Sequence, residues 1–392
     1  MLARLRRSSA AVPKLLLATL LLGIGQQVFV VARNPLLAEL GIQTRVIPHV
    51  QAIGAAAGVL AGLLATWIAP RVRPATVFVA CATLQTLGFF TQSLASAPRT
   101  FLLGSFVAGL AIQLNTAVAP PVLQRMADAD ERPTLFAAHS IALLALAGVF
   151  SAFVVALAAL LFGGSVLGHR AALLAAVSSS AAAIFAFTKV DAASPSVRAR
   201  VRIEHPRRVL LCVAMQALTA LAGGIMLPFL QLYFKLTFGV SLQGVALIYA
   251  VTMSIGTVSF FFAPWLVSRL GLLRAVLLLQ LLMLPLLLEL AWASVTWIAA
   301  TTFVARHALS STAAPLSNTF FQSVSQGRDG EAVAGLGMVT SSVTWTLGSL
   351  LAGPLLARDG GSFRSVIFAS SALFGLVALL GLFVLPHLWR TR

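Results

Sequence analysis

Long apolar runs that almost lack charged residues are the feature that most constrains the fold of this chain. One run extends from Ala275 to Glu289, and its only charged residue is the last. A helix needs about 20 apolar residues to cross a bilayer, and only helices or closed barrels satisfy the backbone inside lipid. The runs do not alternate residue by residue as barrel strands do. We therefore predict an all-α membrane protein.

Composition supports this prediction. Hydrophobic residues make up 59% of the 392 residues and charged residues only 9%, whereas a soluble domain is about 25% charged. A water-soluble fold could not hide so much apolar surface. The arginine-rich start resembles a secretory signal, but the apolar stretch continues from Leu15 to Ala32 with no Ala-x-Ala site after it. We expect it to remain as the first spanning helix.

Twelve segments are long and apolar enough to be spanning helices. The glycine pair in Phe162-Gly163-Gly164-Ser165 marks a break between the fifth and the sixth, because paired glycines weaken a helix. The predicted helices are 14–33, 47–69, 75–96, 100–122, 134–161, 167–188, 208–236, 242–267, 275–290, 295–318, 332–356 and 365–386.

The longest polar segment lies near the middle of the chain and is rich in arginine. We predict an N-terminal six-helix bundle over 1–188, a basic cytoplasmic linker over 189–207 and a C-terminal six-helix bundle over 208–392. With the N-terminus inside, most of the 27 Lys and Arg residues fall in cytoplasmic segments, as the positive-inside rule requires. This orientation puts both termini in the cytoplasm and favours a multi-pass protein of the cell (inner) membrane.

The two halves repeat short sequence patterns at a nearly constant offset. Phe106-Val107-Ala108 corresponds to Phe303-Val304-Ala305, Ala119-Pro120 to Ala314-Pro315, and Gly148 to Gly348, while Trp67 and Trp265 each precede a basic loop. Parallel repeats of this kind place a substrate site between the halves, near the bilayer midplane.

The loops after the second and eighth helices carry the pattern of a known family. Ser268 to Arg274 keeps Arg269, Gly271 and Arg274 of the pattern G-x-L-A-D-R-x-G-R-R but has Ser268 in place of its Asp. The first copy keeps Arg71 and Arg73. With these loops and the repeat, the chain resembles the major facilitator superfamily. The resemblance implies two pseudo-symmetric six-helix bundles, a central cavity lined by helices 1, 4, 7 and 10, and a role for these loop residues in conformational change.

Proton-coupled drug exporters of that family often carry an Arg in helix 4, four residues before a Gly. Here Gly109 matches the Gly, but the Arg position is Ser105. Helix 5, around Gly148, also lacks the expected Pro. The motifs therefore do not favour drug–proton antiport.

Arg306 is the main candidate substrate contact. It lies about eleven residues into helix 10, near the bilayer centre, where an Arg costs about 2.5–3.5 kcal/mol. Its repeat counterpart is Gly109. One interpretation is a counter-ion for an anionic substrate. The alternative is a structural Arg bonded to carbonyls or to polar groups of helix 7 or 11.

Five amides at membrane depth are further substrate-binding candidates: Gln26, Gln27, Gln113, Asn115 and Gln216. An amide can hydrogen-bond a substrate without charge, and it can equally hold two helices together. Both uses stay open for each of them. Arg33 is expected at the outer end of helix 1, with an interfacial or a gating role.

The candidates for ion coupling are His307, His139 and Glu289. Of the ten carboxylates, only Glu289 lies in a predicted helix, near the outer end of helix 9, whereas coupled transporters usually place a carboxylate centrally. This distribution favours a uniporter, or an exchanger of anions built around Arg306.

Other classes of function find little support in the sequence. Cys81 and Cys212 lie in apolar runs as small buried hydrophobes, the six His are scattered, and no metal-ligand spacing occurs. No Walker-type Lys follows a glycine run. The net charge of +17 sits between apolar runs, which indicates topogenic charge beside lipid and no nucleic-acid partner. We expect no enzyme activity, metal or cofactor, and a monomer in the lipid bilayer.

The leading hypothesis is therefore a secondary transporter of a small organic solute that carries negative charge and crosses by alternating access. An exporter or flippase of amphipathic drugs or lipids is the second possibility, with an apolar cavity. A membrane scaffold or sensor that transports nothing on the same fold is the third.

Overall fold

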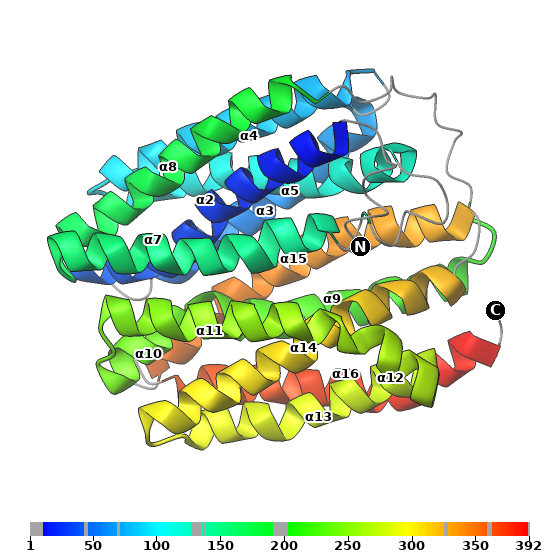
Figure 1. Cartoon of the computed structure of the whole chain (residues 1–392). Coiled ribbons are helices and arrows are strands. Elements are labelled where there is room, and N and C mark those ends of the chain that lie inside the picture. Colours follow the sequence, from blue (N-terminus) through cyan, green and yellow to red (C-terminus); the bar gives the residue numbers. More distant parts are fainter. Residues whose placement is uncertain are drawn as a thin grey trace. The chain divides into compact units, whose positions relative to one another are not determined.

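A computed structural model of the protein describes residues 11–42, 46–68, 71–126, 135, 138–190, 203–324, 328–358 and 363–390. The ordered elements of these residues are helices, and Figure 1 shows them coloured along the sequence. In the first half they are α2 (Ala11–Glu39), α3 (Ile47–Ile68), α4 (Pro74–Leu94), α5 (Pro98–Met126), the π-helix η1 (Ile141–Leu146), α7 (Ala147–Phe162) and α8 (Val166–Thr188).

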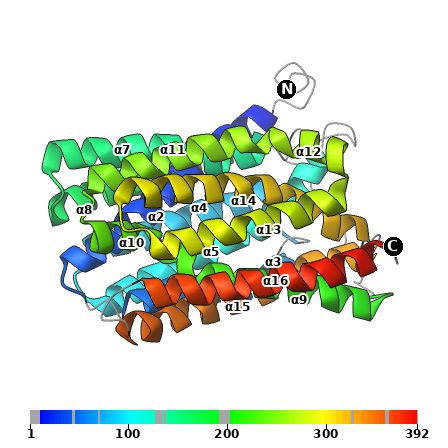
Figure 2. The same cartoon turned by 90° about the horizontal axis from the view of Figure 1, so that it is seen from below.

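The second half continues in the same way, and Figure 2 shows its helices from below. Its elements are α9 (Pro206–Met226), the 3₁₀ turn η2 (Leu227–Phe229), α10 (Leu230–Phe238), α11 (Leu242–Phe260), α12 (Phe262–Leu270), α13 (Leu272–Trp292), α14 (Thr296–Val324), α15 (Arg328–Arg358) and α16 (Arg364–Arg390).

Each predicted span falls on one helix or on consecutive helices of the described residues, so the all-α membrane fold is confirmed. Within the part of the chain that the structure describes, ten stretches are long and apolar enough to cross a membrane. α14 and α15 are not among the ten, since Ser and Thr recur along both. The predicted break after Phe162 is also confirmed, because α7 ends there and Gly163 has a φ of 73°, a backbone conformation that favours glycine.

Two predicted helices contain an interruption. The range 208–236 falls in the single candidate span Pro206–Phe238, which passes from α9 through η2 to α10, and the range 242–267 is divided between α11 and α12. Pro228 has no N–H to bond the carbonyl of Gly224, and the chain passes through the turn η2 there. The Ser349 hydroxyl of α15 donates to that Gly224 carbonyl at 3.2 Å. Pro264 likewise cannot bond Phe260, and α11 gives way to α12 just before it.

The fifth span contains a widened turn that the sequence does not predict. A continuous helix over 134–161 is expected, but residues 141–146 form the π-helix η1, and 134 and 136–137 lie outside the described residues. Gly23 of α2 packs against the Leu143 carbonyl so closely that a Cβ there would overlap it. The π turn and the glycine together let α2 approach the fifth span.

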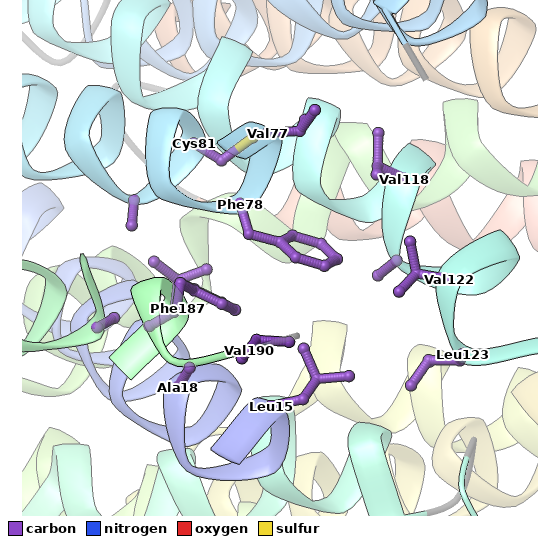
Figure 3. Packing of buried hydrophobic residues seen from close by; sticks show 14 of the residues in the cluster. Leu15, Ala18, Val77, Phe78, Cys81, Val118, Val122, Leu123, Phe187 and Val190 are labelled. Atoms are coloured by element: carbon purple, nitrogen blue, oxygen red, sulfur yellow. The ribbon is translucent and has the colours of Figure 1, made fainter. Parts of the chain in front are cut away.

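The chain divides into two compact units, each with its own core. The first comprises the described residues of Met1–Ile42, Ile53–Arg198 and Ser241–Ala250, and the second those of Gln43–Ala52, Ala199–Val240 and Val251–Arg392. In the first unit α2, α4, α5 and α8 bury a cluster around Leu15, Phe78 and Val122, with Phe78 stacked on Phe187 (Figure 3). In the second, α9, α13, α14 and α16 bury a cluster around Leu279 and Phe320.

Candidate functional site

Arg306 lies in the second unit and is buried between helices. Its side chain is 3% exposed, and its Cζ atom lies 5.8 Å from the centroid of the Phe374 ring on α16. A guanidinium over an aromatic face gains electrostatic attraction from the ring quadrupole. The predicted depth of Arg306 therefore corresponds to a position inside the unit, on the side of α14 that faces α16.

Aromatic residues of α10 and α14, and Phe363 just before α16, pack near the start of α14. The Phe303 ring meets Phe234 of α10 with centroids 5.8 Å apart, and Tyr233 meets Phe363 at 5.6 Å. The Tyr233 hydroxyl donates to the Leu290 carbonyl at 2.8 Å, which joins α10 to the end of α13. These aromatic contacts lie about one turn of α14 from Arg306.

Gln231 on α10 is a buried amide that the sequence analysis did not select. It is 1% exposed, and its Oε1 atom has no hydrogen-bond partner among the described residues. The available signal was an amide three residues after Pro228 in an apolar run, but α10 could not be predicted as a separate helix. A buried acceptor without a donor is rare and calls for a physical explanation.

His307 points to a different neighbour from Arg306, as successive helical residues should. A Cβ added at Gly256 of α11 would lie 2.8 Å from its ring, so His307 packs against that glycine. One turn farther along α14, the Thr312 hydroxyl donates to the Ser259 carbonyl of α11 at 3.0 Å. The two adjacent candidates therefore contact different helices: Arg306 lies against α16 and His307 against α11.

In the first unit Gln26 belongs to a network that joins three helices. Its Nε2 donates to Gln85 Oε1 on α4 at 2.9 Å, and Gln85 Nε2 donates to Ser180 of α8 at 3.0 Å and to the Leu22 carbonyl at 3.2 Å. Gln85 was missed in the sequence, where nothing distinguishes it from other amides. Through these bonds Gln26 helps to hold α2, α4 and α8 together. Its contact with substrate stays a prediction.

Arg33 is not at the end of helix 1, so the expected position is wrong. α2 continues through Pro35 to Glu39, and Arg33 is half-buried within it. Its Nη1 donates to the Ser105 hydroxyl at 3.4 Å, and Ser105 in turn donates to Gln92 at 3.0 Å. The guanidinium also lies 5.7 Å from the Phe29 ring.

The remaining predicted amides do not gather with Arg306 in one unit. Gln27, Gln113 and Asn115 belong to the first unit, with Asn115 buried and the other two half-buried. Gln216 belongs to the second, where its amide fills the space beside Gly337 of α15. His139 is half-buried and directly precedes the region of the π-helix.

The loop candidates and Glu289 are on the surface. Glu289 is exposed near the end of α13, and Arg71, Arg73, Arg269 and Arg274 are exposed in or beside the turns between helices. Gly271, with a φ of 77°, is the single residue between α12 and α13. Ser268, which stands where the family pattern has Asp, donates its hydroxyl to Trp265 of its own helix at 2.7 Å.

The residues that could hold a metal do not cluster. Among the described residues no group of three His, Cys, Asp or Glu side chains lies close enough to bind an ion. Cys81 and Cys212 are buried free thiols inside the two cores.

Taken together, the ten apolar helical stretches among the described residues and the polar side chains buried between helices define a polytopic helical membrane protein. The sequence matches the model of the Major Facilitator Superfamily over residues 15–349. The chain belongs to this superfamily, and the protein is a transporter rather than an enzyme. No curated protein sequence matches the chain.

Several solved transporters share the fold at low sequence identity. The POT family transporter PepTSo aligns with a TM-score of 0.77 at 10% identity, covering 97% of this chain and 99% of that one. A mutant of the nucleoside transporter NupG aligns with a TM-score of 0.76 at 13% identity, covering 95% of this chain and 99% of that one. The D-xylose-proton symporter aligns with a TM-score of 0.74 at 14% identity, covering 94% of this chain and 96% of that one. Similarity at this low identity establishes the fold, and it does not show which substrate this chain transports.

Proposed function

We propose that the protein is a secondary transporter of a small organic solute with negative charge, which Arg306 binds as a counter-ion. The solute crosses by alternating access between the two helical halves. We place the protein in the cell (inner) membrane as a monomer with both termini in the cytoplasm. Superfamily membership supports transport itself.

The observation that carries the anionic substrate is a buried guanidinium in helices without acidic residues. Arg306 is 3% exposed, and no Asp or Glu occurs in the sequences of α9, α10, α14 or α16. A charge at such depth is costly and commonly marks a substrate or ion pathway. An anionic solute would supply the opposite charge that these helices do not contain.

The distribution of carboxylates supports uniport or anion exchange. Glu289, the carboxylate predicted to lie within a span, is exposed near the end of α13. Buried carboxylates are the usual carriers of coupling protons in transporters. Exchange of one anion for another needs no such group, because the bound solute itself compensates Arg306 in both directions.

The test compares wild type, Arg306→Lys and Arg306→Ala in proteoliposomes preloaded with candidate carboxylates, phosphates and neutral solutes. We expect Arg306→Ala to weaken binding of the transported anion at least tenfold, while Arg306→Lys retains part of it because the charge remains. Equal affinity of wild type and Arg306→Ala for every transported solute would remove Arg306 from the binding site. Lipids or apolar drugs that are transported at the same rate by wild type and by both variants would instead support the flippase or exporter alternative.

A further inference from the structure

We propose that the turn between α12 and α13 binds the headgroup of an anionic phospholipid. Arg269 and Arg274 contact the phosphate, and the exposed rings of α12 lie along the acyl chains. This lipid site is separate from Arg306 and does not depend on which solute the protein transports.

The aromatic surface of α12 is the first observation. α12 is a short helix at one end of the second unit (Figure 1), and Ala263 is its one buried residue. Phe262 and Trp265 are each 56% exposed, and Phe261 just before them is 64% exposed. Trp side chains of membrane proteins concentrate where the acyl chains meet the headgroups. The surface of α12 therefore fits this boundary of the bilayer.

Arg269 extends the aromatic surface toward the end of α12. Phe262, Trp265 and Arg269 are spaced by three and then four residues, which places them on one side of the helix. All three are exposed. Two rings followed one turn later by a guanidinium follow the order of groups in a phospholipid, from its acyl chains to its phosphate.

Arg274 begins a second exposed stripe, on α13. Leu278, Leu281 and Leu282 follow it at helical spacing, and all are exposed. Gly271 is the single residue between α12 and α13, so the two guanidiniums lie on either side of one tight turn. α13 is long enough to span the membrane, which puts its first turn at the surface of the bilayer.

Neither arginine has an internal counter-ion. Among the described residues, Arg269 and Arg274 form no ion pair and no hydrogen bond. The sequence contains no Asp or Glu between Glu204 and Glu289. The dipole of α12 favours Arg269 in its last turn, but Arg274 lies in the first turn of α13, where the dipole disfavours a cation. An anion from outside the chain would compensate both charges.

The loop also lacks the acidic residue that would compete with such an anion. Ser268 stands where the family pattern has Asp, and its hydroxyl donates to the Trp265 carbonyl at 2.7 Å. An Asp at this position would attract the guanidiniums and repel a phosphate. The neutral serine leaves both arginines to an external ligand.

The combination of charge and apolar surface selects a lipid as this ligand. Arginine binds phosphate through charge-assisted, bidentate hydrogen bonds. Each basic residue near an anionic lipid surface adds to the attraction. A soluble phosphate would satisfy the guanidiniums but would leave the rings of α12 and the leucines of α13 without a partner, whereas a phospholipid covers both.

The experiment measures lipid contact at Trp265 of the full-length protein in phosphatidylcholine proteoliposomes. A small share of the lipid is replaced by dibrominated phosphatidylglycerol or by dibrominated phosphatidylcholine, because bromine quenches nearby tryptophan fluorescence. The signal of Trp265 is the difference between wild type and Trp265→Phe. We expect phosphatidylglycerol to bind at this position on the order of tenfold more tightly than phosphatidylcholine, since each arginine contributes about fivefold.

Three loop variants test the residues of the site. Arg269→Gln and Arg274→Gln should each lower the preference for phosphatidylglycerol about fivefold, and the double variant should abolish it. Ser268→Asp should also lower the preference although both arginines remain, because its carboxylate replaces the phosphate as their partner. These side chains are exposed, so melting temperatures should stay close to that of wild type.

Arg364→Gln is the matched control. Arg364 is also exposed, and its Cζ atom lies 5.9 Å from the centroid of the Trp292 ring, at the opposite end of α13. The substitution removes the same charge from the same unit and should leave the preference at Trp265 unchanged.

Three results would overturn the proposal, each with its own meaning. Equal quenching by the two lipids in wild type would show that Trp265 has only general contact with the bilayer. Loss of the preference when inorganic phosphate is added would identify a soluble anion as the ligand. Quenching by neither lipid would show that protein covers this surface. None of these results bears on Arg306, because the test of the proposed function measures solute binding.

Discussion

The two arginines within the helices α2 and α14 show how single residues are stabilised in this protein. Arg33 lies over Phe29 and donates to Ser105, while Arg306 lies over Phe374. Each guanidinium has an aromatic face within about 6 Å, the range in which a ring attracts a cation. Neutral rings and a hydroxyl therefore stabilise much of the charge of these two side chains. A search of the sequence for acidic partners would not find such groups.

Gln85 is the residue whose loss should most disturb the first unit. Changing Gln85→Leu removes its bonds to Gln26, Ser180 and the Leu22 carbonyl, and so takes away the amide that joins α2, α4 and α8. We expect a loss of about 2–3 kcal/mol in unfolding free energy. Thermal unfolding in detergent measures this loss.

Thr91→Val on the same helix is the control, because the exposed Thr91 hydroxyl bonds only its own helix. It should change stability by less than about 0.5 kcal/mol. Equal melting temperatures for Gln85→Leu and wild type would show that the network contributes nothing to the fold.

The sequence predicted the depth of Arg306 and the presence of amides in the spans, but not the contacts that define the site. The Phe374 ring that covers Arg306 lies in a different helix, and no local pattern links the two positions. Gln231 could not be distinguished from Gln216 in the sequence. Gln231 is buried with an unpaired oxygen, whereas Gln216 is half-buried beside Gly337.

At the scale of whole elements, proline shows what a local pattern can and cannot predict. Pro35 and Pro285 lie inside the continuous helices α2 and α13, whereas Pro228 separates α9 from α10. The spans themselves were predictable because their length and apolarity are local properties. At Pro228 the Ser349 hydroxyl of α15 bonds the freed Gly224 carbonyl, a contact that the local sequence around Pro228 does not predict.

A double-mutant cycle tests this exchange of partners. Ser349→Ala should cost about 1–2 kcal/mol, because the Gly224 carbonyl then stays buried without a donor. Pro228→Ala restores an N–H that can bond the same carbonyl, so Ser349→Ala should cost clearly less in that background. Unfolding free energies of the four proteins provide the coupling. A coupling of zero would mean that the hydroxyl does not replace the missing helical bond.

For the whole molecule, the distribution of charge bears on the energy source. A uniporter or anion exchanger needs no proton gradient, and the coupling candidates His139 and His307 are half-buried, with His307 against Gly256. We expect counterflow of anions to persist at equal pH on both sides and to be unaffected by a protonophore. Uptake of labelled substrate into preloaded proteoliposomes measures this.

His307→Gln and His139→Gln are the informative variants for the same assay. Both should retain counterflow within about threefold, because neither group needs to carry a proton in exchange. Transport that requires an imposed pH gradient and disappears in one of these variants would instead identify that histidine as the coupling residue.

The low hydropathy of α14 and α15 has a consequence for biogenesis. A less apolar helix gains less from contact with lipid, so its insertion depends more on partner helices. α13 precedes α14, and α16 follows α15 as the chain emerges. A nascent chain stalled before α16 would therefore present its most polar hairpin to the insertion machinery and the quality-control proteases. We therefore expect a chain that ends before α16 to be degraded faster than the full-length protein.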